Sequence, residues 1–135
     1  MDQSDIERTV DENINGIKKL LGLEKWEIVF AYGEMDDDSF EASCLARVEY
    51  SEAVITIDPN HITDSKHLLR VLLHECCHCL TATFETYKFA VARLLLNDKK
   101  SFDAIDEMYS RANEEVVCGI CRILEGIHWQ KYCKK

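Results

Sequence analysis

The sequence predicts a single α+β domain over residues 1–135, with helices at both ends of the chain and a small sheet between them. A length of 135 residues and a hydrophobic content of 47% suffice for one core. Apolar residues recur at helical spacing near both ends, whereas the alternation typical of strands lies in between. The expected order is a helix, a three-stranded antiparallel or mixed sheet with meander connections, and two further helices.

The first helix is expected from Ser4 to Leu21. Ser4 and Glu7 form a capping-box pattern at its start, and Gly22 is suited to end it. Between them, one apolar stripe runs at helical spacing, which predicts an amphipathic helix packed on the core. The stripe consists of Ile6, Val10, Ile14, Ile17 and Leu21.

Three segments are expected to form the sheet. Residues 26–32 alternate between apolar and polar side chains, and two further candidates follow at Ser43–Tyr50 and Ala53–Ile57. Ser51 and Glu52 between the last two predict a tight hairpin turn.

A second helix is expected to begin after Asp64 or Ser65, either of which can cap it, and to end near Thr83. The apolar stretch 84–97 has no clear assignment. A last long helix is expected to open at Ser101 and to continue to about Ile127.

The most informative motif is His74-Glu75-Cys76-Cys77-His78, within the second predicted helix. Histidines four residues apart lie on the same helix face, so two imidazoles can bind one metal ion. Glu75 is then placed to take a proton from a water bound to that metal. The apolar residues around the motif make partnerless burial of these polar groups costly. The motif therefore predicts a zinc site; the alternative is two core histidines and a glutamate paired with an arginine.

A catalytic zinc needs one more protein ligand. The downstream candidates are Glu85, Glu107, Glu114, Glu115, Glu125 and His128. Glu114 borders the apolar stripe of the last helix, whereas Glu115 points nearly opposite to it. We expect Glu114 to be the third ligand, as a buried carboxylate at the edge of an apolar face, with Glu115 as the alternative.

The seven cysteines offer a competing hypothesis. Cys76 with Cys79, and Cys118 with Cys121, form two C-x-x-C spacings, which are typical of structural zinc sites. Both pairs are expected within helices and lack a glycine-bearing turn, so small buried thiols are the simpler interpretation. A redox role for the second pair is disfavoured because no strand precedes it.

Charge and composition exclude several classes. The net charge of −9 disfavours nonspecific binding to nucleic acid or to an anionic membrane. The chain starts without a basic flank and apolar run, and no apolar stretch is long enough to span a bilayer. We therefore expect a cytoplasmic protein with reduced thiols.

The residues His74, Glu75, His78 and the pair Asn113-Glu114 resemble the gluzincins, zinc peptidases with His-Glu-x-x-His on one helix and a glutamate on a later one. The chain is most similar to the minimal zincin domains of phages and prophages, which would place it in a host cytoplasm. The order of elements agrees over roughly 26–124. Cys76-Cys77 departs from many relatives, which carry a small apolar residue and glycine there. Cys118 also departs from the gluzincins that carry an aspartate four residues after the ligand glutamate, which is the position of Cys118 relative to Glu114.

The resemblance implies a zinc-dependent peptidase in which His74, His78 and Glu114 bind one zinc ion and Glu75 is the general base. It also implies that strand Ala53–Ile57 is a sheet edge that pairs with an extended protein or peptide substrate. The residue that would stabilise the oxyanion is not identified. Its candidates are Tyr87, Tyr109 and His128.

A different class of function stays open from the sequence. The chain could be a non-catalytic domain, either of the zincin fold or built on a cysteine-bound zinc, that acts as a protein-binding module. An intact Glu75 favours the enzyme, because binding alone would not require it.

Overall fold

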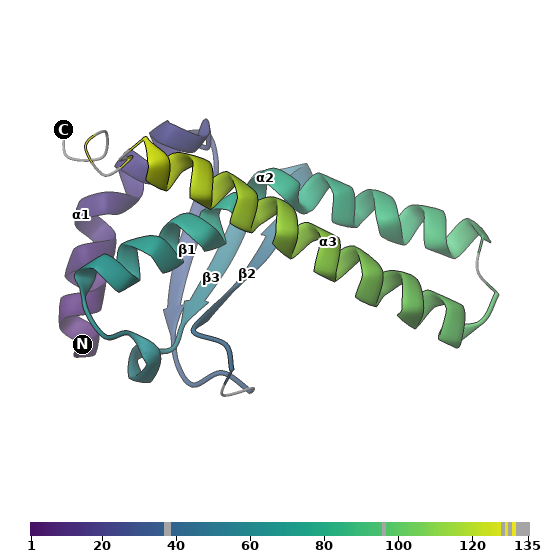
Figure 1. Ribbon diagram of the computed structural model, residues 1–135, viewed down its shortest axis with the longest axis horizontal. Coiled ribbons are helices and arrows are strands. Elements are labelled where there is room, and N and C mark those ends of the chain that lie inside the picture. The colour runs from purple at the N-terminus through teal and green to yellow at the C-terminus, as the bar shows by residue number, and fades with distance from the viewer. Residues whose placement is uncertain (37–38, 96, 128, 130, 132–135) are drawn as a thin grey trace.

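The computed structural model describes residues 1–135 apart from 37–38, 96, 128, 130 and 132–135 (Figure 1). Its helices and strands are α1 (Gln3–Leu21), β1 (Glu27–Tyr32), β2 (Ala42–Arg47), β3 (Glu52–Ile57), α2 (Ser65–Leu95) and α3 (Lys99–Gly126). Short 3-10 turns lie at Val48–Tyr50 and Pro59–His61. This arrangement confirms the predicted α+β class. No helix among the described residues is long and apolar enough to cross a membrane.

The sheet is mixed, and its order corrects two predictions. The strands lie in the order β1-β3-β2, with β3 parallel to β1 and antiparallel to β2. The connections are therefore not a meander, and Ala53–Ile57 is part of the central strand instead of an edge. Its side chains explain this position, since Ala53, Ile55 and Ile57 are buried.

One face of the sheet carries the core. Ile28 and Phe30 of β1 pack against this core beside the buried Ile55 of β3, while Val29 and Val54 point to the other, exposed face. The helices cover the first face (Figure 1). The predicted strand to Tyr50 stops at Arg47, because residues 48–50 turn into a 3-10 segment and Ser51 adopts a left-handed conformation with φ 54°.

The caps of the first and last helices also differ from the predictions. Asp2, not Ser4, caps α1 by accepting a hydrogen bond from the Asp5 amide, and Gly22 ends the helix with φ 70° as expected. Asp98 caps α3 by accepting from the Ser101 amide at 2.8 Å, so that helix begins at Lys99. Both helices therefore begin one or two residues earlier than predicted, and the same side chains face the core.

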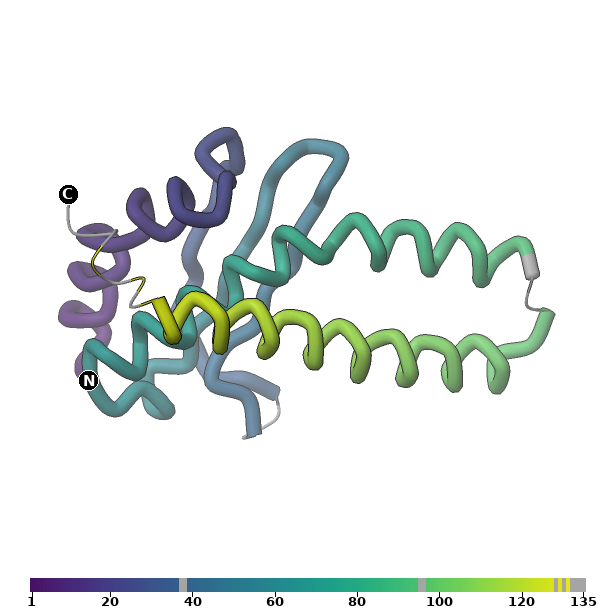
Figure 2. Tube along the Cα trace, turned by 45° about the horizontal axis from the view of Figure 1, so that its top comes forward, coloured from purple at the N-terminus to yellow at the C-terminus, as the bar shows by residue number. Residues whose placement is uncertain are grey.

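Helix α2 is longer than predicted. Asp64 precedes it and accepts from the His67 amide at 2.8 Å, as the sequence indicated. The helix continues beyond Thr83 to Leu95, through the stretch that had no assignment. Helix α3 then returns beside it, so that α2 and α3 form an antiparallel hairpin that projects beyond the sheet (Figures 1 and 2). The motif lies where this hairpin leaves the core.

Candidate metal centre

The two motif histidines lie on the side of α2 that faces α3. The intervening Cys76 and Cys77, and Cys79 after the motif, are fully or almost fully buried in the core. A helix that buries three residues of this segment must present positions 74 and 78 toward its other side. His74 and His78 are accordingly half-buried, with an aqueous boundary on one side and packed protein on the other.

Three side chains bring four donor atoms together at this point. The Nε2 atoms of His74 and His78 lie 3.2 Å apart. Glu114 of α3 places one carboxylate oxygen 3.2 Å from His74 Nε2 and the other 3.1 Å from His78 Nε2. The predicted third residue is therefore brought to the two histidines by the pairing of α2 with α3.

This spacing fits a metal. Tetrahedral zinc with Zn–N and Zn–O bonds of 2.0–2.1 Å separates neighbouring donors by about 3.3 Å. The observed separations of 3.1–3.2 Å are close to that value, and the two that involve Glu114 run to its two different carboxylate oxygens. Two imidazoles and a carboxylate are also a donor set that zinc takes up in catalytic sites. One prediction was wrong in detail: the Glu114 side chain is 54% exposed, so it reaches the histidines from the solvent side.

Glu75 lies next to these donors but faces a different direction. Its side chain is 7% exposed, and one of its carboxylate oxygens lies within 4.8 Å of a ring nitrogen of His74 and of one of His78. Burial raises the pKa of Glu75 to about 7. A carboxyl group with that pKa is half ionised near neutrality, which suits a group that both accepts and returns a proton.

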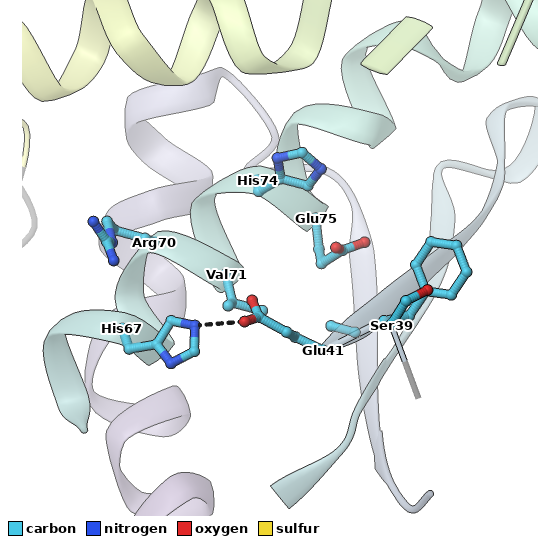
Figure 3. A pocket seen from close by; sticks show the side chains of 9 residues that line it. Ser39, Glu41, His67, Arg70, Val71, His74 and Glu75 are labelled. Carbon is cyan, nitrogen blue, oxygen red and sulfur yellow. Dashed lines mark ion pairs between the residues drawn. The ribbon is translucent and has the colours of Figure 1, made fainter. Parts of the chain in front are cut away.

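A pocket opens beside Glu75, between α2 and the start of β2 (Figure 3). Its volume is about 410 Å³, and its lining includes His74, Glu75 and, across from them, Glu41. His67 and Arg70 stand on the same wall as His74, at helical spacing from it, and His67 Nε2 lies 3.1 Å from the Glu41 carboxylate. Sequence reasoning did not select these two residues, although the spacing 67, 70, 74 could have revealed them.

Each motif histidine has a further partner on α3. The Asn113 side-chain nitrogen lies 3.3 Å from His78 Nδ1. Turning this amide would let its oxygen accept from Nδ1–H, which leaves the Nε2 lone pair for a metal. His74 shares a hydrogen bond with the Cys121 thiol, and this contact raises the pKa of His74. Burial lowers the pKa of His78. The contact of Asn113 with His78 and that of Cys121 with His74 each restrain the orientation of one imidazole ring.

The cysteines do not form the four-thiol site that their spacing offered. Cys79 lies against Cys44 of β2, with 3.9 Å between the sulfurs, and Cys77 is hydrogen-bonded to Cys121. Within the described residues, two groups of side chains could hold a metal ion. They are His74 with Glu75 and His78, and His74 with Glu114 and Cys118, and neither contains two cysteines. Helical geometry explains this, because neither pair sits in a turn that would aim both sulfurs at one point.

The remaining candidates do not reach the centre. Tyr87 is 71% exposed, and the Tyr109 hydroxyl donates to the Thr81 carbonyl at 3.5 Å. Glu115 is exposed and forms no ion pair with a described residue. His128 lies outside the described residues.

Comparisons of the chain with models of protein families, with curated proteins and with solved structures found no significant match.

Proposed function

We propose that this protein is a zinc-dependent peptidase of the gluzincin class, with zinc held by His74, His78 and Glu114. The observation that carries the proposal is the convergence of these three donors at 3.1–3.2 Å beside the buried carboxylate of Glu75. A metal held by the histidine pair would acidify a bound water, but the reaction also needs a group that accepts the proton of that water. The added, nearly buried Glu75 with its raised pKa supplies a proton acceptor.

The chemistry divides between the metal and the protein. A bound zinc ion would supply Lewis acidity, polarising a peptide carbonyl and acidifying the attacking water. Glu75 would accept the proton of that water and later pass it to the leaving amine. Asn113 and Cys121 would hold the two imidazoles in orientation, so that the donors need little rearrangement when the site is loaded.

The pocket suggests how a substrate chain would lie. Strand β2 pairs with β3 on one side, and among the described strands nothing pairs with its other side. Glu41 and Ala42, at the start of β2, line the pocket that also contains Glu75. An extended peptide could add to this free edge by main-chain hydrogen bonds and pass its scissile bond in front of Glu75. The substrate edge we propose is therefore β2.

The test begins with metal content, measured by mass spectrometry on protein purified without a histidine tag. We expect about one zinc per chain in the parent and none in the double variant His74→Ala/His78→Ala. His67→Ala is the matched control, since it removes a histidine of the same helix outside the donor cluster, and it should keep the metal.

Peptide hydrolysis is then screened with Glu75→Gln as the blank. We expect this variant to retain zinc and to lose activity by at least about a thousandfold, because the proton acceptor is gone. Zinc retained in the double histidine variant would overturn the site. Equal hydrolysis by the parent and by Glu75→Gln, or none by either against a broad peptide library, would overturn the enzyme and leave a binding module.

A further inference from the structure

A fourth side chain with a metal-binding atom stands at the same centre. Cys118 lies one helical turn after Glu114 on α3, so the two share a face, as His74 and His78 do on α2. The Cys118 sulfur, a Glu114 carboxylate oxygen and a His74 ring nitrogen all lie within 4.8 Å of one another. Two antiparallel helices thus each contribute a pair of donors spaced by four residues.

The other cysteines near the motif are either fully buried in the core, as Cys76 is, or in contact with another side chain. Cys121 is hydrogen-bonded to Cys77 and to His74, and Cys79 lies against Cys44. Cys118 is half-buried and forms no such contact with a described residue. It is therefore the thiol that remains free to face the donors.

We propose that Cys118 is a fourth protein ligand, which closes the metal centre in the resting protein. This inference rests on the proposed metal site and adds a form of regulation to it. A Zn–S bond of about 2.3 Å places sulfur about 3.6 Å from the nitrogen and oxygen donors. The Cys118 sulfur lies within 4.8 Å of one donor atom of His74 and one of Glu114, so binding requires these two separations to shorten by up to about 1 Å.

The exchange is balanced without oxidation. When Cys118 binds, its S–H bond breaks, the proton passes to solvent, the sulfur bonds the metal and one water molecule leaves. Thiolate is a soft ligand that zinc accepts readily, so it competes effectively with water. A substrate must displace the sulfur before hydrolysis, which makes the resting centre a latent one with two histidines, one glutamate and one cysteine.

X-ray absorption at the zinc edge tests the ligand directly. The zinc-loaded parent should show one sulfur at about 2.3 Å beside nitrogen and oxygen donors at 2.0–2.1 Å. Cys118→Ser should keep one metal per chain and lose the sulfur. Cys44→Ser is the matched control, since its thiol contacts Cys79 outside the donor cluster, and it should keep the sulfur. Cobalt-loaded samples should show the same pattern, as loss of the near-ultraviolet thiolate band in Cys118→Ser alone.

Hydrolysis provides a second readout. If the thiolate holds the centre closed about nine-tenths of the time, Cys118→Ser should hydrolyse peptide about tenfold faster than the parent. Circular dichroism confirms that the variant is folded, and Cys118→Ala serves as a second variant in case serine oxygen replaces the sulfur.

The outcomes separate the two proposals. Metal bound in the parent without sulfur, or sulfur kept with Cys118→Ser, overturns the Cys118 ligand and leaves the peptidase intact. A zinc–sulfur bond that depends on Cys118, in a protein that hydrolyses no peptide in any variant, supports the ligand and overturns the peptidase. A parent that binds no zinc overturns both.

Discussion

The two halves of helix α2 differ sharply in how they are buried. In the first half, residues 65–79, Leu72 is fully buried and the segment packs against α1 and the sheet. In the second half, residues 80–95, Phe84, Tyr87 and Leu94 have 65%, 71% and 83% of their surface exposed. The second half contacts α3 and projects beyond the sheet (Figure 2).

The metal centre lies at the boundary between these two halves. His74 and His78 stand at the end of the well-packed half, and Val117, the buried anchor of α3, lies just beyond Glu114. Donors held on packed helices keep their geometry, whereas donors further along the hairpin would move with it. The centre sits at the last position where α3 is still fixed to the core.

The largest expected difference in stability is between two leucine-to-alanine substitutions, one in each half of α2. Leu72→Ala should lower the free energy of unfolding by about 3 kcal/mol, because it leaves a cavity in the core. Leu94→Ala should change it by less than about 0.5 kcal/mol, since that side chain is in solvent. Urea denaturation of the chelator-treated protein measures both. Similar losses for both would mean that the projecting half supports the fold after all.

A second contrast compares Glu75 with Glu85. The pKa of Glu75 is raised to about 7 in the folded protein, so ionising it opposes folding, and stability falls as pH rises from about 4.5 to 7. Glu75→Gln should therefore stabilise the metal-free protein at pH 8 by up to about 3 kcal/mol, and leave it unchanged at pH 4. The exposed Glu85→Gln should have no effect beyond about 0.5 kcal/mol at either pH.

Thermal unfolding with chelator present, at the two pH values, makes this measurement. Equal stabilisation by Glu75→Gln at pH 4 and pH 8 would show that the glutamine acts through packing and that the carboxyl group does not titrate during folding. The expected pattern would instead show that the proposed proton acceptor is kept at a cost to stability.

Among the described residues of the projecting half, the buried charged side chain is that of Lys88. Its side chain is 5% exposed, forms an ion pair with Asp106 of α3 and lies over the rings of Phe89 and Tyr109. Lys88→Ala should cost about 2 kcal/mol, locally, because it removes the ion pair, the ring contacts and the packed stem. Lys88→Met keeps the stem and should lose about half as much.

Amide hydrogen exchange shows which part of α2 is destabilised in Lys88→Ala. Amides of residues 80–95 should exchange faster in Lys88→Ala, while those of residues 65–79 keep their protection. Faster exchange throughout α2 would show that its two halves unfold together, and the comparison between them would fail.

The sequence predicted features that depend on one segment, and it did not predict contacts between segments that are distant in the chain. Local patterns predicted α1, the start of the motif helix and the shared face of His74 and His78, because helical periodicity and four-residue spacing are properties of one segment. The order β1-β3-β2 and the partners of His74 and His67 depend on which segments meet across the fold. Cys121 is 47 positions from His74, and neither residue shows this contact in its own neighbourhood.

The smallest expected effects come from two helix caps with the same local geometry. Asp64 accepts from the His67 amide and Asp98 from the Ser101 amide, each at 2.8 Å. These hydrogen bonds lower the pKa of both carboxyl groups. The stabilisation by each cap is therefore complete above the usual aspartate pKa and is lost as the pH falls through the lowered value.

Asp64 begins the packed half of α2, whereas Asp98 lies at the tip of the hairpin. Asp64→Ala should lower Tm by about 4 °C and Asp98→Ala by less than about 1 °C, because a frayed hairpin tip leaves the core folded. Equal shifts in calorimetry would show that the tip belongs to the same cooperative unit as the core, and the metal centre would then lie inside that unit instead of at its boundary.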